Sequence, residues 1–275
     1  MDGYDVYRTA MSGDHWRGWW VNWPLSNRIR LGDVYEVQRN ALHRAGDLAG
    51  RGITFTTENG APPATYVYDS QGSVAVTFKA SGTSPGALSA LTRADAGAAL
   101  EFHRDRTAFV AFQGISQTGL ADVRALAEQL VEAWMNKSWD ESLRAVTSMV
   151  SVAAGTVLTA AAAGASAVLR MTGAVGAGGP TAMLDLAVGG SLVSSNALGA
   201  EWTGPELTPF YQVVGLRKPW LRKVEADFGP PQPGRGGFPG TLAPIVVEQI
   251  RDDPDAVLTV ADPEEQLPFA TGEPG

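Results

Sequence analysis

The stretch TVLTAAAAGASAVLRMTGAVGAGG, residues 156–179, decides whether this 275-residue chain spans a membrane or folds as a sheet. Its one charged side chain is Arg170, and none occurs from Ala145 to Leu169. That is long enough for a spanning helix, which needs about 20 predominantly apolar residues. However, Ala, Gly, Ser and Thr dominate, and β-branched residues alternate along the segment. We therefore predict strands at 147–160 and 165–175, joined by a turn at 161–164.

Other segments also repeat with a period of two. Residues 72–80 (GSVAVTFKA), 96–102 (AGAALEF) and 106–112 (RTAFVAF) alternate large and small side chains, and 182–199 is a further strand candidate. Residues 118–135 change to a helical period and predict one amphipathic helix. The expected fold class is α+β: a twisted, mainly antiparallel sheet with peripheral helices.

The strands within 146–199 are small or apolar on both faces. A half-exposed antiparallel strand has one polar face. Two explanations remain open: the strands are covered on both faces, or they pack on protein first and contact lipid later. Transmembrane β-strands need about 9–11 residues each and have a similarly weak hydropathy signal.

The charge is concentrated near the end of the chain. The net charge is −8, and residues 241–275 carry eight acidic residues against Arg251, which leaves the rest nearly neutral. Residues 229–240 (GPPQPGRGGFPG) have the composition of a linker, with Arg235 and Phe238 as candidate protease sites. We expect a domain at 1–228, a linker at 229–240, and an inhibitory tail at 241–275 that docks through Ile245, Val246, Val247 and Ile250.

Two clusters suggest contact with a membrane. The first is a group of basic residues around a tryptophan: Arg217, Lys218, Trp220, Arg222 and Lys223. It is either a binding site for anionic headgroups or a solvated turn. The second is a tryptophan-rich segment, either a core anchor, a partner-binding patch or a membrane-interface element: Trp16, Trp19, Trp20 and Trp23.

No pattern supports catalysis. Phosphate-binding loops, nucleophile elbows and metalloprotease motifs are missing from the sequence, and the absence of cysteine excludes disulfides and cysteine-ligated zinc. Glu101, His103 and Asp105 lie at alternate positions, on one face of a strand, and are therefore candidate metal ligands. A solvated, charged strand end is a simpler interpretation than a metal site. We expect no enzyme activity, no cofactor, no metal and no nucleic-acid partner. The first residues lack a secretory signal, so we expect a cytoplasmic protein.

The order of these elements resembles the gasdermin pore-forming family, and its short bacterial members in particular. The resemblance covers about residues 28–223. It lies in the strand GSVAVTFKA, the returning strands AGAALEF and RTAFVAF, the amphipathic helix, the strand SLRAVTSMVSV and the strand LTPFYQVVGL. Where the family has Val-Val-Thr-Glu-Val, this chain reads Ala145-Val146-Thr147-Ser148-Met149, which lacks the acidic residue. Many bacterial members also carry an acylated N-terminal cysteine, which has no counterpart here.

The resemblance implies a mechanism. The tail would inhibit the body until a protease cuts the linker. The body would then bind membrane lipids at the cell inner membrane and oligomerise with itself into a β-barrel pore. That pore would kill the cell in bacterial immune (antiphage) defence. Residues 72–112 and 146–199 would become transmembrane hairpins, with apolar positions Val74, Val76, Phe78, Leu100, Phe102, Val150, Val152, Leu158, Leu186 and Val188. The alternatives are a non-enzymatic α+β interaction or structural module, and a hydrolase with a dispersed site.

Overall fold

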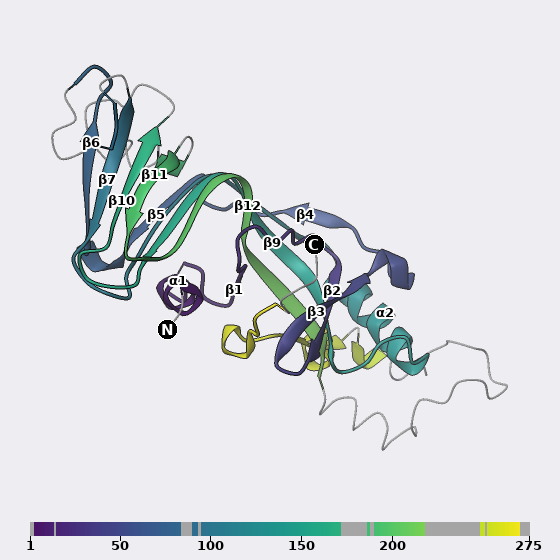
Figure 1. Ribbon diagram of the computed structural model, residues 1–275. Helices are drawn as coiled ribbons and strands as arrows, with labels where there is room; N and C mark the ends of the chain where they lie inside the picture. Colours follow the sequence, from purple (N-terminus) through teal and green to yellow (C-terminus); the bar gives the residue numbers. More distant parts are fainter. Residues whose placement is uncertain are drawn as a thin grey trace.

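The computed structural model describes residues 3–13, 15–83, 90–92, 95–171, 186–187, 190–217, 248–250 and 252–269. Two sheets of unequal size dominate the molecule, and helices lie at their periphery (Figure 1). The α-helices are α1 (Gly3–Met11), α2 (Val123–Met135) and α6 (Pro254–Val257), with 3-10 turns η1 (Ala49–Arg51), η2 (Ser70–Gly72) and η3 (Pro263–Glu265). This arrangement confirms the expected α+β class.

The larger sheet is built around β9 (Leu143–Ala160), the central strand. Along one side β9 pairs with β12 (Leu198–Leu216), and along the other with β8 (Ala108–Leu120) and then β2 (Asp33–Gln38). The outer strands are β1 (Trp20–Val21) and β13 (Leu258–Val260) on β12, β3 (Ala41–Asp47) on β2, and β4 (Thr57–Asn59) and β5 (Thr65–Asp69) on β8. All of these pairings are antiparallel.

The smaller sheet has four strands in the order β11-β10-β7-β6. These are β6 (Val74–Lys79), β7 (Ala96–Phe102), β10 (Ser166–Met171) and β11 (Gly190–Asn196). Figure 1 shows this sheet at one end of the molecule, with α2 at the other end. The division into two sheets was not predicted from the sequence.

The helix α2 confirms the expected amphipathic helix but begins later than 118. Residues 118–120 end β8, and the Asp122 carboxylate caps the helix by accepting a hydrogen bond from the Ala125 amide at 2.9 Å. The stripe Leu126, Leu130 and Trp134 is buried against the larger sheet. No helix in the part of the chain that the structure describes is both long and apolar enough to cross a bilayer.

The central prediction about the opening stretch, two strands in place of a spanning helix, is also confirmed up to residue 171, while the predicted strand residues 172–175 lie outside the described part of the chain. Residues 143–160 and 166–171 are the strands β9 and β10, with a tight turn between them in which Gly164 has φ +79°. The strand expected at 182–199 is observed only in part: Leu186 and Ala187 are helical, the strand β11 starts at Gly190, and residues 182–185 and 188–189 lie outside the described residues.

Candidate functional site: two hairpins and a docked tail

Two β-hairpins make up the smaller sheet. The first hairpin is β6 with β7, the second hairpin is β10 with β11, and they meet through pairing of β7 with β10. Val74, Val76 and Phe78 alternate with exposed Ala75 and Thr77, so the sheet has an apolar inward face and an outward face. Each hairpin has strands of six and seven residues.

Each hairpin continues directly into the larger sheet. The strand β7 leads into β8, β9 leads into β10, and β11 leads into β12 through Ala197, which has φ +54°. At this corner Phe102 and Ala165 are tied together: the Phe102 amide donates to the Ala165 carbonyl, and the Gly164 amide donates to the Phe102 carbonyl, each at 2.8 Å. Successive strands of the chain therefore connect the two sheets, which fold against each other at a corner.

The inward face of the smaller sheet packs on the ends of β8 and β9. Six of the fourteen residues buried there are alanines. The set is Val74, Ala98, Leu100, Phe102, Phe109, Ala111, Leu158, Ala160, Ala165, Ala167, Leu169, Met171, Leu186 and Ala187. The Thr156 hydroxyl donates to the Leu186 carbonyl at 2.7 Å and ties the second hairpin to β9. Because alanine contributes little apolar area, this contact is weaker per residue than a leucine-rich core.

The residues predicted for the transmembrane hairpins do not all lie in the smaller sheet. Five belong to its inward face: Val74, Val76, Phe78, Leu100 and Phe102. Val150, Val152 and Leu158 lie in β9 of the larger sheet, where all three are buried. Leu186 lies in a helical turn, and Val188 lies outside the described residues.

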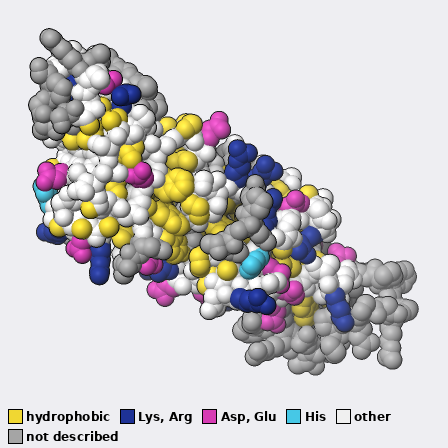
Figure 2. Space-filling view, in the orientation of Figure 1, with side chains coloured by type: hydrophobic (Ala, Val, Ile, Leu, Met, Phe, Trp, Pro, Cys, Tyr) yellow, Lys and Arg dark blue, Asp and Glu magenta, His cyan; other side chains and the backbone are white. Residues whose placement is uncertain are grey.

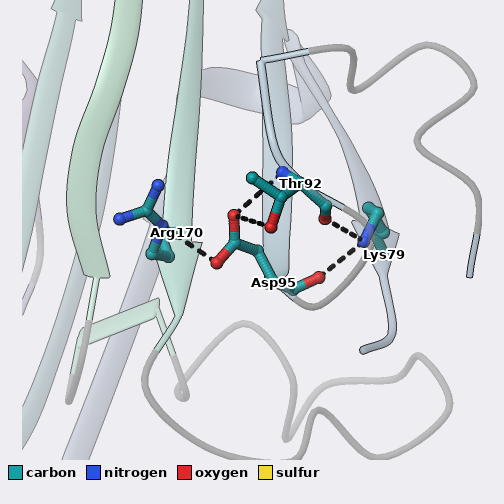
Figure 3. Close-up of polar contacts among 4 residues, drawn as sticks. All are labelled: Lys79, Thr92, Asp95 and Arg170. Atoms are coloured by element: carbon teal, nitrogen blue, oxygen red, sulfur yellow. Dashed lines mark hydrogen bonds and ion pairs between the residues drawn. The ribbon is translucent and has the colours of Figure 1, made fainter. Parts of the chain in front are cut away.

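A polar cluster, which we call the clasp, closes the far end of the smaller sheet: Lys79, Thr92, Asp95 and Arg170 (Figure 3). The Lys79 ammonium is buried and donates to the Thr92 carbonyl at 3.0 Å and the Asp95 carbonyl at 2.6 Å. The Asp95 carboxylate accepts from the Thr92 amide and hydroxyl and pairs with Arg170 at 3.2 Å. The pKa of Asp95 is lowered, chiefly by the two Thr92 hydrogen bonds and further by Arg170 and Lys79. Sequence reasoning missed the clasp.

The tail docks on the body first by strand pairing. The strand β13 adds to the outer edge of β12, and the Ala261 amide donates to the Val213 carbonyl at 3.0 Å. Arg217, from the predicted basic cluster, donates its amide to the Val257 carbonyl at 2.8 Å and its Nε to the Leu258 carbonyl at 3.0 Å. Ile250 is fully buried in the core formed with α2.

The tail also reaches the N-terminal segment through side chains. The side-chain amide of Gln266 bonds to both backbone groups of Val21, as a neighbouring strand would. Its Oε1 accepts from the Val21 amide at 3.0 Å, and its Nε2 donates to the Val21 carbonyl. The Trp20 indole donates to the Ala261 and Asp262 carbonyls, each at 3.1 Å. Phe269 packs against Tyr35 and stacks on Tyr211, with ring centroids at 5.3 and 6.2 Å. Burial raises the pKa of both tyrosines, so they remain neutral here.

The other predicted site residues lie outside the described part of the chain. These are the basic-cluster members Lys218, Trp220, Arg222 and Lys223, the linker residues Arg235 and Phe238, and the tail residues Ile245, Val246 and Val247.

The tryptophan-rich segment is largely a core anchor. Trp16 stacks on Phe210 with ring centroids 4.2 Å apart, and Trp20 is 1% exposed. Trp19 and Trp23 are half-buried at the edge of the same aromatic core. In the same orientation as Figure 1, Figure 2 shows hydrophobic side chains gathered across the middle of the visible face of the molecule.

The described residues hold no group of three or more potential metal ligands. Glu101, His103 and Asp105 are exposed, and Asp105 contacts neighbouring Arg106 at 3.8 Å. A cavity of about 280 Å³ lies between α1, the tryptophan-rich segment and η3, and both basic and acidic side chains line it: Arg8, Arg17, Asp262 and Glu264.

The geometry defines an α+β protein with two hairpins folded on its main sheet and a docked C-terminal tail. No known protein family matches the sequence, and no curated protein matches it. Among solved structures, it is similar to a bacterial gasdermin from Bradyrhizobium tropiciagri, with 13% identity over 73% of this chain and 82% of that chain, at a TM-score of 0.29. This similarity is to the same family that the order of elements in the sequence resembles. At this identity and TM-score it does not extend to individual residues or to activity.

Proposed function

We propose that this chain is an autoinhibited pore-forming effector. A protease removes the tail, the body binds a membrane from the cytoplasmic side, and copies oligomerise into a β-barrel pore in the cell inner membrane that causes cell death in bacterial immune (antiphage) defence. The chain performs no catalysis in this scheme and needs no cofactor or nucleic acid.

The observation that carries the proposal is the construction of the smaller sheet. Its two hairpins are extensions of the long strands of the body, so they can swing away without breaking the chain's main pairings between β8, β9 and β12. Alanines make up six of the fourteen buried residues in the core that they leave, and these lower the cost of exposing it compared with larger side chains. Once released, their apolar inward face needs a new covering, and lipid can supply it.

The docked tail supports the inhibitory part of the proposal. It contacts β12, α2 and the Trp20–Val21 segment without a covalent link beyond the chain itself. Cutting the connection at 229–240, at Arg235 or Phe238, turns an intramolecular contact into a bimolecular one and lowers its effective concentration. Loss of the tail also frees Arg217, which we group with Lys218, Trp220, Arg222 and Lys223 as the surface that binds anionic headgroups.

The deciding experiment compares the full chain with a form ending at Gly234. We expect the shortened form to be toxic in bacteria and to release dye from vesicles containing anionic lipid, while the full chain does neither. A shortened form that is folded, non-toxic and unable to cause leakage would contradict pore formation and favour a non-enzymatic interaction module.

A further inference from the structure

The clasp bridges the two hairpins on the outward face of the smaller sheet. Lys79, Gly97 and Arg170 lie in one row across β6, β7 and β10. Gly97 has no side chain, and the buried side chain of Leu91 occupies the space above it. Thr92 and Asp95 thereby lie over this row, between the two cations (Figure 3).

The clasp also stops β7 from growing towards the hairpin tip. Continuing the β6–β7 register beyond Lys79 and Gly97 would place Asp95 opposite Ser81 in a longer ladder. Instead, Asp95 is held in a turn, because its amide donates to the Thr92 carbonyl at 3.1 Å while its carboxylate accepts from Thr92. The first hairpin cannot lengthen at this end until these contacts break.

Strand length makes this restraint relevant to the proposed pore. A transmembrane β-strand needs about 9–11 residues. The strands of the two hairpins have six or seven residues, so they must lengthen before they can cross a bilayer.

We propose that the clasp is a latch between the two hairpins, separate from the tail, that must open before the hairpins lengthen. This inference rests on the proposed function. Among the described residues, Asp95–Arg170 is the ion pair that joins the two hairpins. Its side chains are 19% and 46% exposed, so the pair is partly solvated and weak enough to open reversibly. Because the pKa of Asp95 is lowered, the carboxylate stays charged at neutral pH, and the latch does not open by protonation there.

The first test uses the intact chain, with its tail in place, and measures amide hydrogen exchange at 95–98 and 168–171. Asp95→Asn keeps a carbonyl oxygen for the Thr92 amide but removes the charge. We expect Asp95→Asn and Arg170→Gln each to raise exchange roughly two- to fivefold, which is the range for loss of a partly exposed pair. The double variant should exchange no faster than either single variant, because both remove one contact.

Asp105→Asn is the matched control, because it breaks the highly exposed Asp105–Arg106 pair near the other end of β7. It should leave exchange at these amides unchanged. Wild-type exchange in both Asp95→Asn and Arg170→Gln would overturn the latch.

The second test measures dye release from phosphatidylcholine vesicles containing phosphatidylglycerol, after the folded chain is cut at a specific protease site placed within 229–240. We expect a shorter lag for Asp95→Asn and Arg170→Gln than for the cut wild-type chain, and an equal lag would count against the latch. If no cut chain releases dye, the proposed function fails, and exchange in the intact chain alone still decides the latch.

Discussion

At the residue scale, backbone strain marks the places where long strands bend. Ala197 joins β11 to β12 with φ +54°, and Glu206 within β12 has φ +53°. This left-handed region costs a residue with a Cβ roughly 1–2 kcal/mol. A straight strand needs neither conformation. The observed form, with the hairpins folded on the larger sheet (the closed form), therefore holds strain that a straightened hairpin would lose.

Ala197→Gly should therefore stabilise the closed form. Glycine adopts positive φ without penalty but loses more backbone entropy on folding, so we expect a net gain of about 0.5–1 kcal/mol. Thermal or urea unfolding measures this gain. Ala99→Gly, at an ordinary position in β7, is the matched control and should lose stability by a similar amount. A loss of stability in both variants would show that Ala197 is not strained.

Individual residues also show where sequence reasoning stops. The inward positions Val74, Val76 and Phe78 could be predicted, because period two fixes their common face. The burial of Lys79 could not, since it depends on the carbonyls of Thr92 and Asp95, which lie more than ten residues away in the sequence. Thr92 and Asp95 have the spacing of a local side-chain turn, but no sequence signal pairs Asp95 with Arg170.

At the element scale, the sequence predicted strands well and their grouping poorly. The strands β6, β7, β8, β9 and β10 were all predicted from alternation. The helix α2 was placed too early, although Asp122 is a recognisable N-cap for a later start. The corner between the sheets depends on contacts such as Phe102 with Ala165, which are set by tertiary packing that no periodicity encodes.

The two faces of β6 allow a matched test of membrane insertion. Val76 lies on the apolar inward face and Thr77 on the outward face, so Val76 should face lipid and Thr77 the pore interior. A cation facing lipid near the bilayer centre costs roughly 2–4 kcal/mol. In the form ending at Gly234, Val76→Arg should abolish dye release, and Thr77→Arg should preserve it.

Circular dichroism of both β6 variants provides the folding control. Val152→Arg follows equally from the sequence but is a poorer test, because Val152 is 2% exposed and a charge there would disrupt the closed fold itself. Equal leakage from folded Val76→Arg and Thr77→Arg would contradict insertion of β6.

At the scale of the whole molecule, the tail can be locked in place, because the natural chain has no cysteine to interfere. At the two ends of the β12–β13 ladder, the Ala261 amide bonds to the Val213 carbonyl and the Arg217 amide to the Val257 carbonyl. Hydrogen-bonded and non-hydrogen-bonded pairs alternate along an antiparallel ladder. Val214 and Val260, which are opposite each other next to the first of these bonds, therefore form a closely spaced, non-hydrogen-bonded pair. The variant Val214→Cys/Val260→Cys should form a disulfide across this pair. After the linker is cut, the oxidised variant should stay inactive on vesicles and release dye once it is reduced.

The single variants Val214→Cys and Val260→Cys, cut and oxidised in the same way, serve as controls. Each should cause dye release from vesicles without being reduced. Leakage from the oxidised double variant, with the disulfide confirmed by mass, would show that release of β13 from β12 is not required.

The contact between Gln266 and Val21 joins segments from opposite ends of the chain, and this has a consequence for biosynthesis. Proteins are made from the N-terminus at about 5–20 residues per second, so the roughly 50 residues after Leu216 take about 3–10 s to follow. During every round of translation, the body is thus synthesised before the segment that covers β12 and Val21. The pairing of Asp95 with Arg170 lies wholly within the part already made, so it can restrain the hairpins during that interval.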